Sequence, residues 1–267
     1  MMNNKVRSLV FFFFAMTILI LVFSCTSQDK KESNETLTVL CYNIHHGEGV
    51  DGILSLERIA SLINTVSPDI VALQEVDVNT NRTERVNQIE ELGKLTNMNS
   101  VFGKSMDFDE GQYGNAVLTR FDIIDSTTFP LPGEPRSALA VTLGLDSIDG
   151  IEIVFISTHL DTRLKFRKQS IPLIENILDN YESTPLILAG DLNDTPVSEI
   201  MQQLFKDLDN ATPNIYTVPV DVPEKQIDYI LFKPQKEWTV LSSKALDEKV
   251  ASDHRAIMAV FKLNYEN

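Results

Sequence analysis

The chain has 267 residues, of which 43% are hydrophobic and 23% are charged, and its formal net charge is −15 at pH 7. This length and apolar content are enough for one large domain with a sizeable core. The excess of acidic residues disfavours tight, non-specific binding to nucleic acids, because an acidic surface repels a polyphosphate backbone. Only two cysteines are present, Cys25 and Cys41, so a disulfide framework is excluded.

Residues 1–24 have the pattern of a signal peptide. Lys5 and Arg7 give a short basic start, and an apolar run over residues 9–23 follows that is short for a membrane span. With Cys25 at its end, the segment resembles a bacterial lipoprotein signal, which implies cleavage before Cys25 and a lipid attached to this cysteine. An uncleaved N-terminal anchor is the alternative.

Residues 25–35 are polar and contain no aromatic side chain, which predicts a flexible tether. Residues 36–267 show neither a repeat nor a break in composition, so they predict a single domain. We therefore expect a monomer at the cell envelope, lipid-anchored on the periplasmic or the outer-membrane face.

Within this domain, strand and helix patterns alternate. Apolar runs predict strands over residues 36–44, 69–76, 113–120, 137–145, 151–160, 185–192, 227–232 and 254–263. Helical spacing is found from Ser55 to Pro68, over 84–95 and 162–180, and after Val197. Residues 113–120 and 122–129 further suggest a hairpin. Together, these strand and helix patterns predict a mixed α/β fold. Cys41 is expected to be a small buried hydrophobic residue in its first strand.

Polar side chains stand where many of these strands begin or end. They are Asn43, Glu75, His159, Asp191, Asn193, Asp228, Asp253 and His254. One such residue is commonly a structural cap, but several buried carboxylates at one edge would require a cation to neutralise them. Oxygen ligands such as Glu75 and Asp191, without a cysteine cluster, favour Mg²⁺ or Mn²⁺. Phosphoester hydrolysis is the natural chemistry of such a site.

Seven short motifs follow one another along the chain. They read YNI, LQEV, YGNAVLTR, STHLD, GDLND, IDYI and SDHRA, and span about residues 40–257. In this order they resemble the endonuclease/exonuclease/phosphatase superfamily, which includes pancreatic-type deoxyribonucleases, abasic-site endonucleases, inositol polyphosphate 5-phosphatases and neutral or bacterial sphingomyelinases. The resemblance implies a four-layer α/β sandwich, with two mixed β-sheets face to face and helices outside. It also implies a Mg²⁺-dependent phosphoric ester hydrolase in which water attacks phosphorus in line.

The resemblance further implies a metal site at the strand ends. Glu75 would be the principal ligand, and Asn43 would hold the metal or an adjacent phosphate oxygen. Asp253 would lie near the metal. Mg²⁺ is the expected ion, with Mn²⁺ as a second possibility, and the number of ions is left open.

The implied catalytic residues are Asp191, Asn193, Asp228, His159 and His254. Asp191 would orient or deprotonate the attacking water, and Asn193 and His159 would bind the phosphate. His254 would contact the phosphate or act as acid or base, with Asp228 fixing its tautomer. Which of Asp191 and His254 is the general base stays open.

Three further residues are expected near the substrate. Asn115 and Arg136 fall where the superfamily places polar side chains. His46 stands with His45, Glu48 and Asp51 in a glycine-rich loop that would contact the leaving group, add a second metal site, or simply form a solvated turn.

Three hypotheses about function stay open, of which two are enzymatic and one is not. A small or lipid-derived phosphoester is the leading hypothesis, since the chain is acidic and has the pattern of a lipid anchor. An extracytoplasmic nuclease is the alternative, and would need a basic groove, for which residues 163–168 with four cations are the one candidate. A non-catalytic surface-binding lipoprotein is the third.

Overall fold

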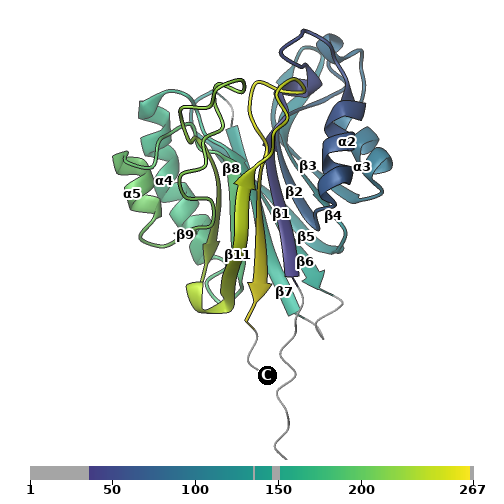
Figure 1. Cartoon of the computed structure of the whole chain (residues 1–267). Coiled ribbons are helices and arrows are strands. Elements are labelled where there is room, and N and C mark those ends of the chain that lie inside the picture. The colour runs from purple at the N-terminus through teal and green to yellow at the C-terminus, as the bar shows by residue number, and fades with distance from the viewer. Residues whose placement is uncertain (1–35, 135, 146–150, 265–267) are drawn as a thin grey trace, which may run out of the picture. The chain divides into compact units, whose positions relative to one another are not determined.

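The computed structural model describes residues 36–134, 136–145 and 151–264. The predicted signal peptide, Cys25 and the predicted tether lie outside these residues. Two six-stranded β-sheets lie face to face, with helices on their outer sides (Figure 1). This confirms the four-layer α/β sandwich. Within the described residues, no helix has the length and apolar character needed to cross a membrane.

Both sheets are mixed. The first sheet has the order β11-β12-β1-β2-β4-β3 and the second the order β5-β6-β7-β8-β10-β9. The pairs β1-β2 and β7-β8 are parallel. The bounds in the first sheet are β1 Thr36–Asn43, β2 Ile70–Val78, β3 Asn99–Phe108, β4 Gly111–Thr119, β11 Trp238–Ala245 and β12 Ile257–Leu263. Those in the second are β5 Asp122–Leu131, β6 Arg136–Leu145, β7 Ile151–His159, β8 Leu186–Asp191, β9 Asp209–Asn210 and β10 Asp228–Lys233.

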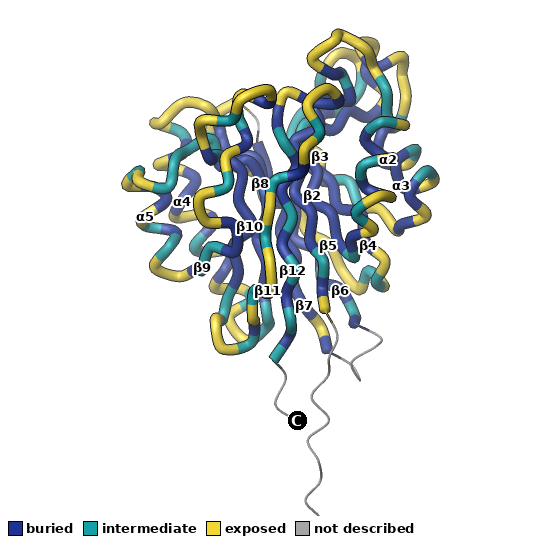
Figure 2. Tube along the Cα trace, viewed as in Figure 1, coloured by how far each residue is buried: buried dark blue, intermediate teal, exposed yellow. Residues whose placement is uncertain are grey.

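Three apolar cores hold the layers together. In β1, Val39 and Cys41 face the core between the sheets, while Leu40 and Tyr42 face the helices that cover the first sheet. This alternation follows from the two-residue period of a strand. Buried residues therefore fill the central strands, while exposed residues concentrate on loops, on the outer faces of the helices and on strands such as β5 and β11 (Figure 2). Cys41 is buried, as predicted, and Trp238 lies in the core between the sheets.

Each sheet is covered by two helices (Figure 1). The helices are α2 Leu56–Val66 and α3 Gln88–Thr96 on the first sheet, and α4 Leu164–Asp179 and α5 Glu199–Leu204 on the second. Short 3-10 turns are η1 His45–Gly47, η2 Asn81–Thr83 and η3 Gln235–Glu237. Ser55 caps α2 as predicted, since its hydroxyl accepts a hydrogen bond from the backbone N–H of Arg58.

Two local predictions are wrong. Helix α3 begins after its cap Asn87 and not at residue 84, because Glu84 and Arg85 adopt left-handed backbone angles that end the preceding turn. Residues 113–120 do not form a hairpin with 122–129: β4 pairs with β2 and β3, whereas β5 pairs with β6 in the other sheet. The short link between them carries the chain across the sandwich.

The strand registers bring the polar strand ends to one edge. Asp191 lies opposite His159 in the parallel pair β7-β8 and opposite Asp228 in the antiparallel pair β8-β10. Close backbone approach here requires a glycine: a Cβ on Gly190 would lie 1.9 Å from the carbonyl oxygen of Thr158. The sheets thus gather residues that are far apart in the sequence.

Candidate functional site

Asp191 lies at the centre of the gathered residues. Its Oδ2 atom is 3.2 Å from Asn43 Nδ2, 3.4 Å from His159 Nε2 and 3.8 Å from His254 Nε2. Its Oδ1 atom accepts a hydrogen bond from the backbone N–H of Asn193 at 2.8 Å. Burial, together with the neighbouring charge of Asp228, raises the pKa of Asp191 to about 7. The structure therefore brings these predicted residues into one buried cluster.

His254 is held by a carboxylate. Its Nδ1 atom lies 2.9 Å from Asp228 Oδ2, and this same oxygen accepts a hydrogen bond from the hydroxyl of Thr217 at 2.5 Å. Burial lowers the pKa of His254, but the charge and hydrogen bond of Asp228 and the charge of Asp191 outweigh it and raise this pKa to about 10. At neutral pH His254 is therefore an imidazolium, and its Nε2–H lies on the side of the ring that faces Asp191.

His159 has the opposite character. Burial, together with the charges of Arg136 and His254, holds its pKa well below the ordinary value, so the ring is neutral. Arg136 Nη1 lies 3.4 Å from its Nδ1, and Asn193 Nδ2 lies 3.0 Å from its Nε2. With its hydrogen on Nε2, the ring can accept from Arg136 at Nδ1 and face the carboxylate of Asp191, while the amide nitrogen of Asn193, itself a donor, gives a hydrogen to the backbone oxygen of Leu160 at 2.9 Å. The two histidines of the cluster thus differ in charge at the same pH.

Arg136 is buried without a carboxylate partner. Only 8% of the residue is exposed, its Nη1 donates a hydrogen bond to the hydroxyl of Tyr113 at 2.8 Å, and its Nε has no hydrogen-bond partner. Among the described residues, no carboxylate forms an ion pair with it. A buried, uncompensated cation is unfavourable unless an anion joins it. The guanidinium therefore suits an anionic group such as a phosphate.

Glu75 projects from an irregular point of β2. The register of β2 against β4 shifts between Leu73 and Val76, and Glu75 has a φ of 60°, which is rare for a residue with a side chain. Its Oε1 accepts a hydrogen bond from Asn43 Nδ2 at 3.1 Å, and Asn43 also contacts Asp191. The strained conformation redirects this carboxylate toward the cluster, as strain at a functional site commonly does.

The donor set fits a hard divalent cation. Among the described residues, one group of three acidic or histidine side chains has ligand atoms within 4.8 Å of one another: Asp191, Asp228 and His254. Because His254 is protonated and paired with Asp228, these three resemble a proton-carrying group more than a complete metal cage. Among the residues that the structure describes, the carboxylate of Glu75 has a single hydrogen-bond partner, Asn43, and so keeps free oxygen lone pairs for an ion. The raised pKa of Asp191 and the unpartnered Oδ1 of buried Asp228 both indicate excess negative charge that a cation would relieve.

Two predicted residues, Asp253 and Asn115, are placed less centrally. Asp253 is exposed, and its one hydrogen-bond partner among the described residues is the hydroxyl of Ser252 at 3.4 Å. Asn115 is buried, and its amide donates to the backbone oxygen of Ser137 at 2.8 Å, which ties β4 to β6. Its amide nitrogen is thus used within the protein. The roles of these residues stay predictions.

His46 lies in the left-handed turn η1, where His45 and His46 both have a φ of 44°. It is buried, its Nδ1 has no hydrogen-bond partner, and its Nε2 is 3.6 Å from Glu48. Burial and the charge of Arg82 lower its pKa. The loop is therefore more than a solvated turn, although the described residues form no three-ligand metal group there.

Three neighbours of the cluster were missed in the sequence. Tyr113 stands within the motif YGNAVLTR and Ser252 within SDHRA, so both were marked by the motifs without a role. The hydroxyl of Ser252 donates to the backbone oxygen of Asn43 at 2.7 Å, which joins two strand ends. Thr217, which donates to Asp228, lies in residues 211–223, a segment between the motifs GDLND and IDYI that could border the site but that its proline and β-branched residues made equally typical of an ordinary surface loop.

The candidate basic groove is largely neutralised. Arg163 forms an ion pair with Asp161 at 2.7 Å, and Lys168 one with Glu199 at 3.0 Å. Arg167 is buried, pairs with Asp194 at 3.0 Å and donates to backbone oxygens. The segment therefore offers little free positive charge to a polyphosphate.

Comparisons with known proteins identify the family and the fold. The sequence model of the Endonuclease/Exonuclease/phosphatase family matches residues 40–254. The protein YbhP of Escherichia coli strain K12, described as uncharacterized, is 25% identical over 236 residues, which cover 78% of this chain and 92% of YbhP.

Solved structures show the same fold. An endonuclease/exonuclease/phosphatase family protein from Bacteroides thetaiotaomicron superposes with a TM-score of 0.73 at 19% identity, covering 86% of this chain and 99% of that one. The mannosyl-6-phosphatase Bt3783 from the same species, strain VPI-5482, gives a TM-score of 0.70 at 20% identity, covering 84% and 99%. With the phosphoester-hydrolase fold, a buried Asp and His cluster and a family match over most of its length, the chain belongs to the endonuclease/exonuclease/phosphatase family.

Proposed function

We propose that this protein is a Mg²⁺-dependent phosphoester hydrolase that acts on a small or lipid-derived phosphoester at the cell envelope. One arrangement carries the proposal. Buried Asp191 lies between the imidazolium of His254 and the amide of Asn43, and Asn43 also contacts Glu75. Glu75, which could bind an ion, Asp191, which could bind a water molecule, and the imidazolium of His254 therefore meet at one edge of the sheets.

Glu75 and Asn43 would hold the ion, with Asp253 near it, and Mn²⁺ is the second ion to test. A bound Mg²⁺ supplies polarisation of the phosphoryl group and stabilisation of the departing alkoxide. Asp191 is placed to orient and deprotonate a water molecule, since its pKa near 7 suits a base at neutral pH.

The remaining residues suit phosphate binding. The His254 Nε2–H can donate to a phosphate oxygen, and Asp228 keeps this proton in place by holding the other ring nitrogen. Arg136 supplies a buried positive charge without a carboxylate partner, and Asn193 supplies an amide beside neutral His159. In-line attack needs the phosphate fixed in one orientation, which these donors provide.

A small or lipid-derived substrate fits the charges better than a nucleic acid does. The chain has a formal charge of −15, and three of the four cations in the candidate basic segment are paired with acids. The mannosyl-6-phosphatase of the same fold supports a phosphorylated sugar as one such substrate. A nuclease remains the alternative to be tested.

The envelope location rests on the sequence pattern that ends at Cys25. Thr36 begins β1 and Asn43 ends it, so the predicted tether joins the domain at the end of the strand opposite the candidate site.

The test follows hydrolysis of p-nitrophenyl phosphate and of bis(p-nitrophenyl) phosphate by the protein with Mg²⁺, with a chelator, and in two site variants. Asp191→Asn and His254→Ala are expected to lower kcat by about 10²- to 10⁴-fold, the usual contribution of a positioned acid or base. Asp125→Asn, an exposed carboxylate on β5, is the matched control and should leave the rate unchanged.

A preference for the monoester would direct the search to sugar and other small phosphates, and a preference for the diester to phospholipids and nucleic acids. Absence of turnover on both esters, with Mg²⁺ bound and the fold intact, would contradict the proposal. It would instead favour a non-catalytic binding lipoprotein.

A further inference from the structure

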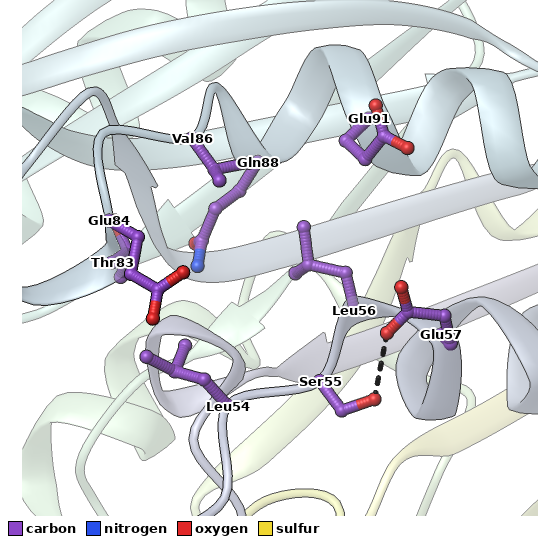
Figure 3. A pocket seen from close by; sticks show the side chains of 9 residues that line it. All are labelled: Leu54, Ser55, Leu56, Glu57, Thr83, Glu84, Val86, Gln88 and Glu91. Atoms are coloured by element: carbon purple, nitrogen blue, oxygen red, sulfur yellow. Dashed lines mark hydrogen bonds between the residues drawn. The ribbon is translucent and has the colours of Figure 1, made fainter.

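A separate pocket lies next to the turn η1, since the side chains of Leu54, Leu56 and Gln88 that line it are also the nearest neighbours of Gly47. Its cavity measures about 370 Å³, which is within the range of small-molecule sites. The lining comes from the start of α2, the turn η2 and the start of α3 (Figure 3). The lining residues are Leu54, Ser55, Leu56, Glu57, Thr83, Glu84, Val86, Gln88 and Glu91.

The middle of the pocket is apolar. Leu54, Leu56 and Val86 present their side chains there, and 37% of Leu54 and of Val86 is exposed to solvent (Figure 3). Exposed apolar surface in a concave site is stabilised when a ligand with an apolar portion covers it.

The charge of the pocket is negative. Glu57, Glu84 and Glu91 line it, and no lysine, arginine or histidine does. Glu84 has no hydrogen-bond or ion-pair partner for its carboxylate among the described residues, and Glu91 approaches a cation only at 3.8 Å, from Lys94. The pocket therefore complements a cation.

The three carboxylates do not converge as metal ligands do. The one group of the described residues whose ligand atoms lie within 4.8 Å of one another is in the candidate site and not here. Acids spread around an apolar middle suit an organic cation, whose charge and apolar chain occupy different parts of the pocket.

Gln88 adds a hydrogen-bond donor. It is 1% exposed and points into the pocket from α3 (Figure 3). Its Oε1 accepts from the backbone N–H of Asp77 at 2.9 Å, and its Nε2 donates one hydrogen to the backbone oxygen of His46 at 2.6 Å. An amide nitrogen carries two hydrogens, and the second has no acceptor among the described residues. A ligand oxygen would satisfy it.

We propose that this pocket binds an organic ammonium ion with a short apolar chain and an oxygen acceptor, the chemistry of an amino alcohol. The apolar chain covers Leu54, Leu56 and Val86, and the ammonium group lies among the glutamates. The oxygen accepts the free hydrogen of Gln88. The proposal concerns binding alone and does not depend on the hydrolytic activity.

Calorimetric titration of the full-length protein at pH 7 tests it with three probes: aminobutanol, n-butylammonium and n-butanol. Aminobutanol should bind saturably, n-butylammonium more weakly, and n-butanol weakest of all. The double variant Glu84→Gln with Glu91→Gln should weaken aminobutanol binding roughly tenfold, because each lost surface ion pair should weaken binding by about twofold to fivefold. Glu182→Gln, an exposed carboxylate outside the pocket, is the control and should bind as the wild type does.

Equal affinity for n-butanol, an unchanged affinity in the double variant, or no saturable binding of aminobutanol would each overturn the proposal. Because these variants change only exposed or half-exposed side chains without changing their size, loss of folding would not confuse the result.

Discussion

Replacing Asp228 with asparagine should release the proton that His254 holds at neutral pH. In the wild type the contact between Asp228 Oδ2 and His254 Nδ1 measures 2.9 Å, and both residues are buried. The asparagine keeps the shape of the side chain but removes its charge. Two influences on the pKa of His254 then remain. Burial favours the neutral ring, and the more distant carboxylate of Asp191, at 3.8 Å, favours the protonated ring.

The size of the effect follows from Coulomb's law. Two opposite unit charges about 3 Å apart attract by roughly 6 kcal/mol at an effective dielectric constant of about 20. Since one pKa unit corresponds to about 1.4 kcal/mol, the pair is worth up to about four units. We therefore expect the pKa of His254 to fall from about 10 in the wild type to below 7 in Asp228→Asn.

Proton NMR of the imidazole signals measures this directly, because the chain has four histidines. In the metal-free wild type, His254 should stay protonated through pH 8, whereas His159 should stay neutral to well below pH 6.5. In Asp228→Asn, the His254 signal should titrate below pH 7, and the pKa of His159 should rise because the neighbouring charge of His254 is lost. A His254 signal that titrates near 6.5 in the wild type would refute the argument.

The same pair makes stability depend on pH. A histidine whose pKa is raised by folding contributes stability that is fully present below its unfolded pKa of about 6.5 and is lost as pH rises through its folded pKa. Urea unfolding should therefore show the wild type losing stability between pH 7 and pH 10. Asp228→Asn should lack this loss of stability. Comparing the two proteins therefore distinguishes the effect of His254 from the titration of lysines and tyrosines, which occurs in both.

Three further predictions concern the ion, acid stability and a buried ion pair. Glu75→Gln should abolish the rise in melting temperature that Mg²⁺ gives the wild type, since the ion would lose its main charged ligand; an unchanged rise would place the ion elsewhere. Hydrogen bonds from Arg163 lower the pKa of Asp161. The carboxylate therefore contributes stability above its unfolded pKa of about 3.9, and this contribution is lost as the pH falls through its folded pKa. In urea unfolding, the difference in stability between the wild type and Asp161→Asn should therefore narrow from pH 5 to pH 2. Arg82→Ala should destabilise the fold by about 2–4 kcal/mol in denaturant unfolding, because it leaves the fully buried carboxylate of Asp77 without its cation; a loss below about 1 kcal/mol would contradict this.

The strand ends show how far local sequence can carry a prediction. An apolar run of five to nine residues closed by a polar residue and a turn is a local pattern, and it located most of the strands together with Asn43, His159 and Asp191 at their ends. The order of the motifs then indicated the family, which the family match confirms. The two helices with clear caps or long apolar spacing, α2 and α4, were likewise found near their observed bounds.

The polar edge strands were harder to predict. β3 and β11 carry mixed exposure without a continuous apolar run, so nothing in their sequence distinguished them from loops. β5 was recognised as extended, but its partner was wrong, because pairing between neighbours in the chain was favoured over a crossing to the other sheet.

Local sequence patterns were therefore enough to indicate the kinds of element, the polar strand ends and the family. Only the tertiary structure showed that Thr217 supports Asp228, that no carboxylate of the described residues pairs with Arg136, and that acids neutralise most of the cations of residues 163–168. The physical reason is that periodicity and turn chemistry act between neighbours in the chain, whereas charge, burial and pKa depend on residues that only the pairing of strands and the packing of two sheets bring within hydrogen-bonding distance.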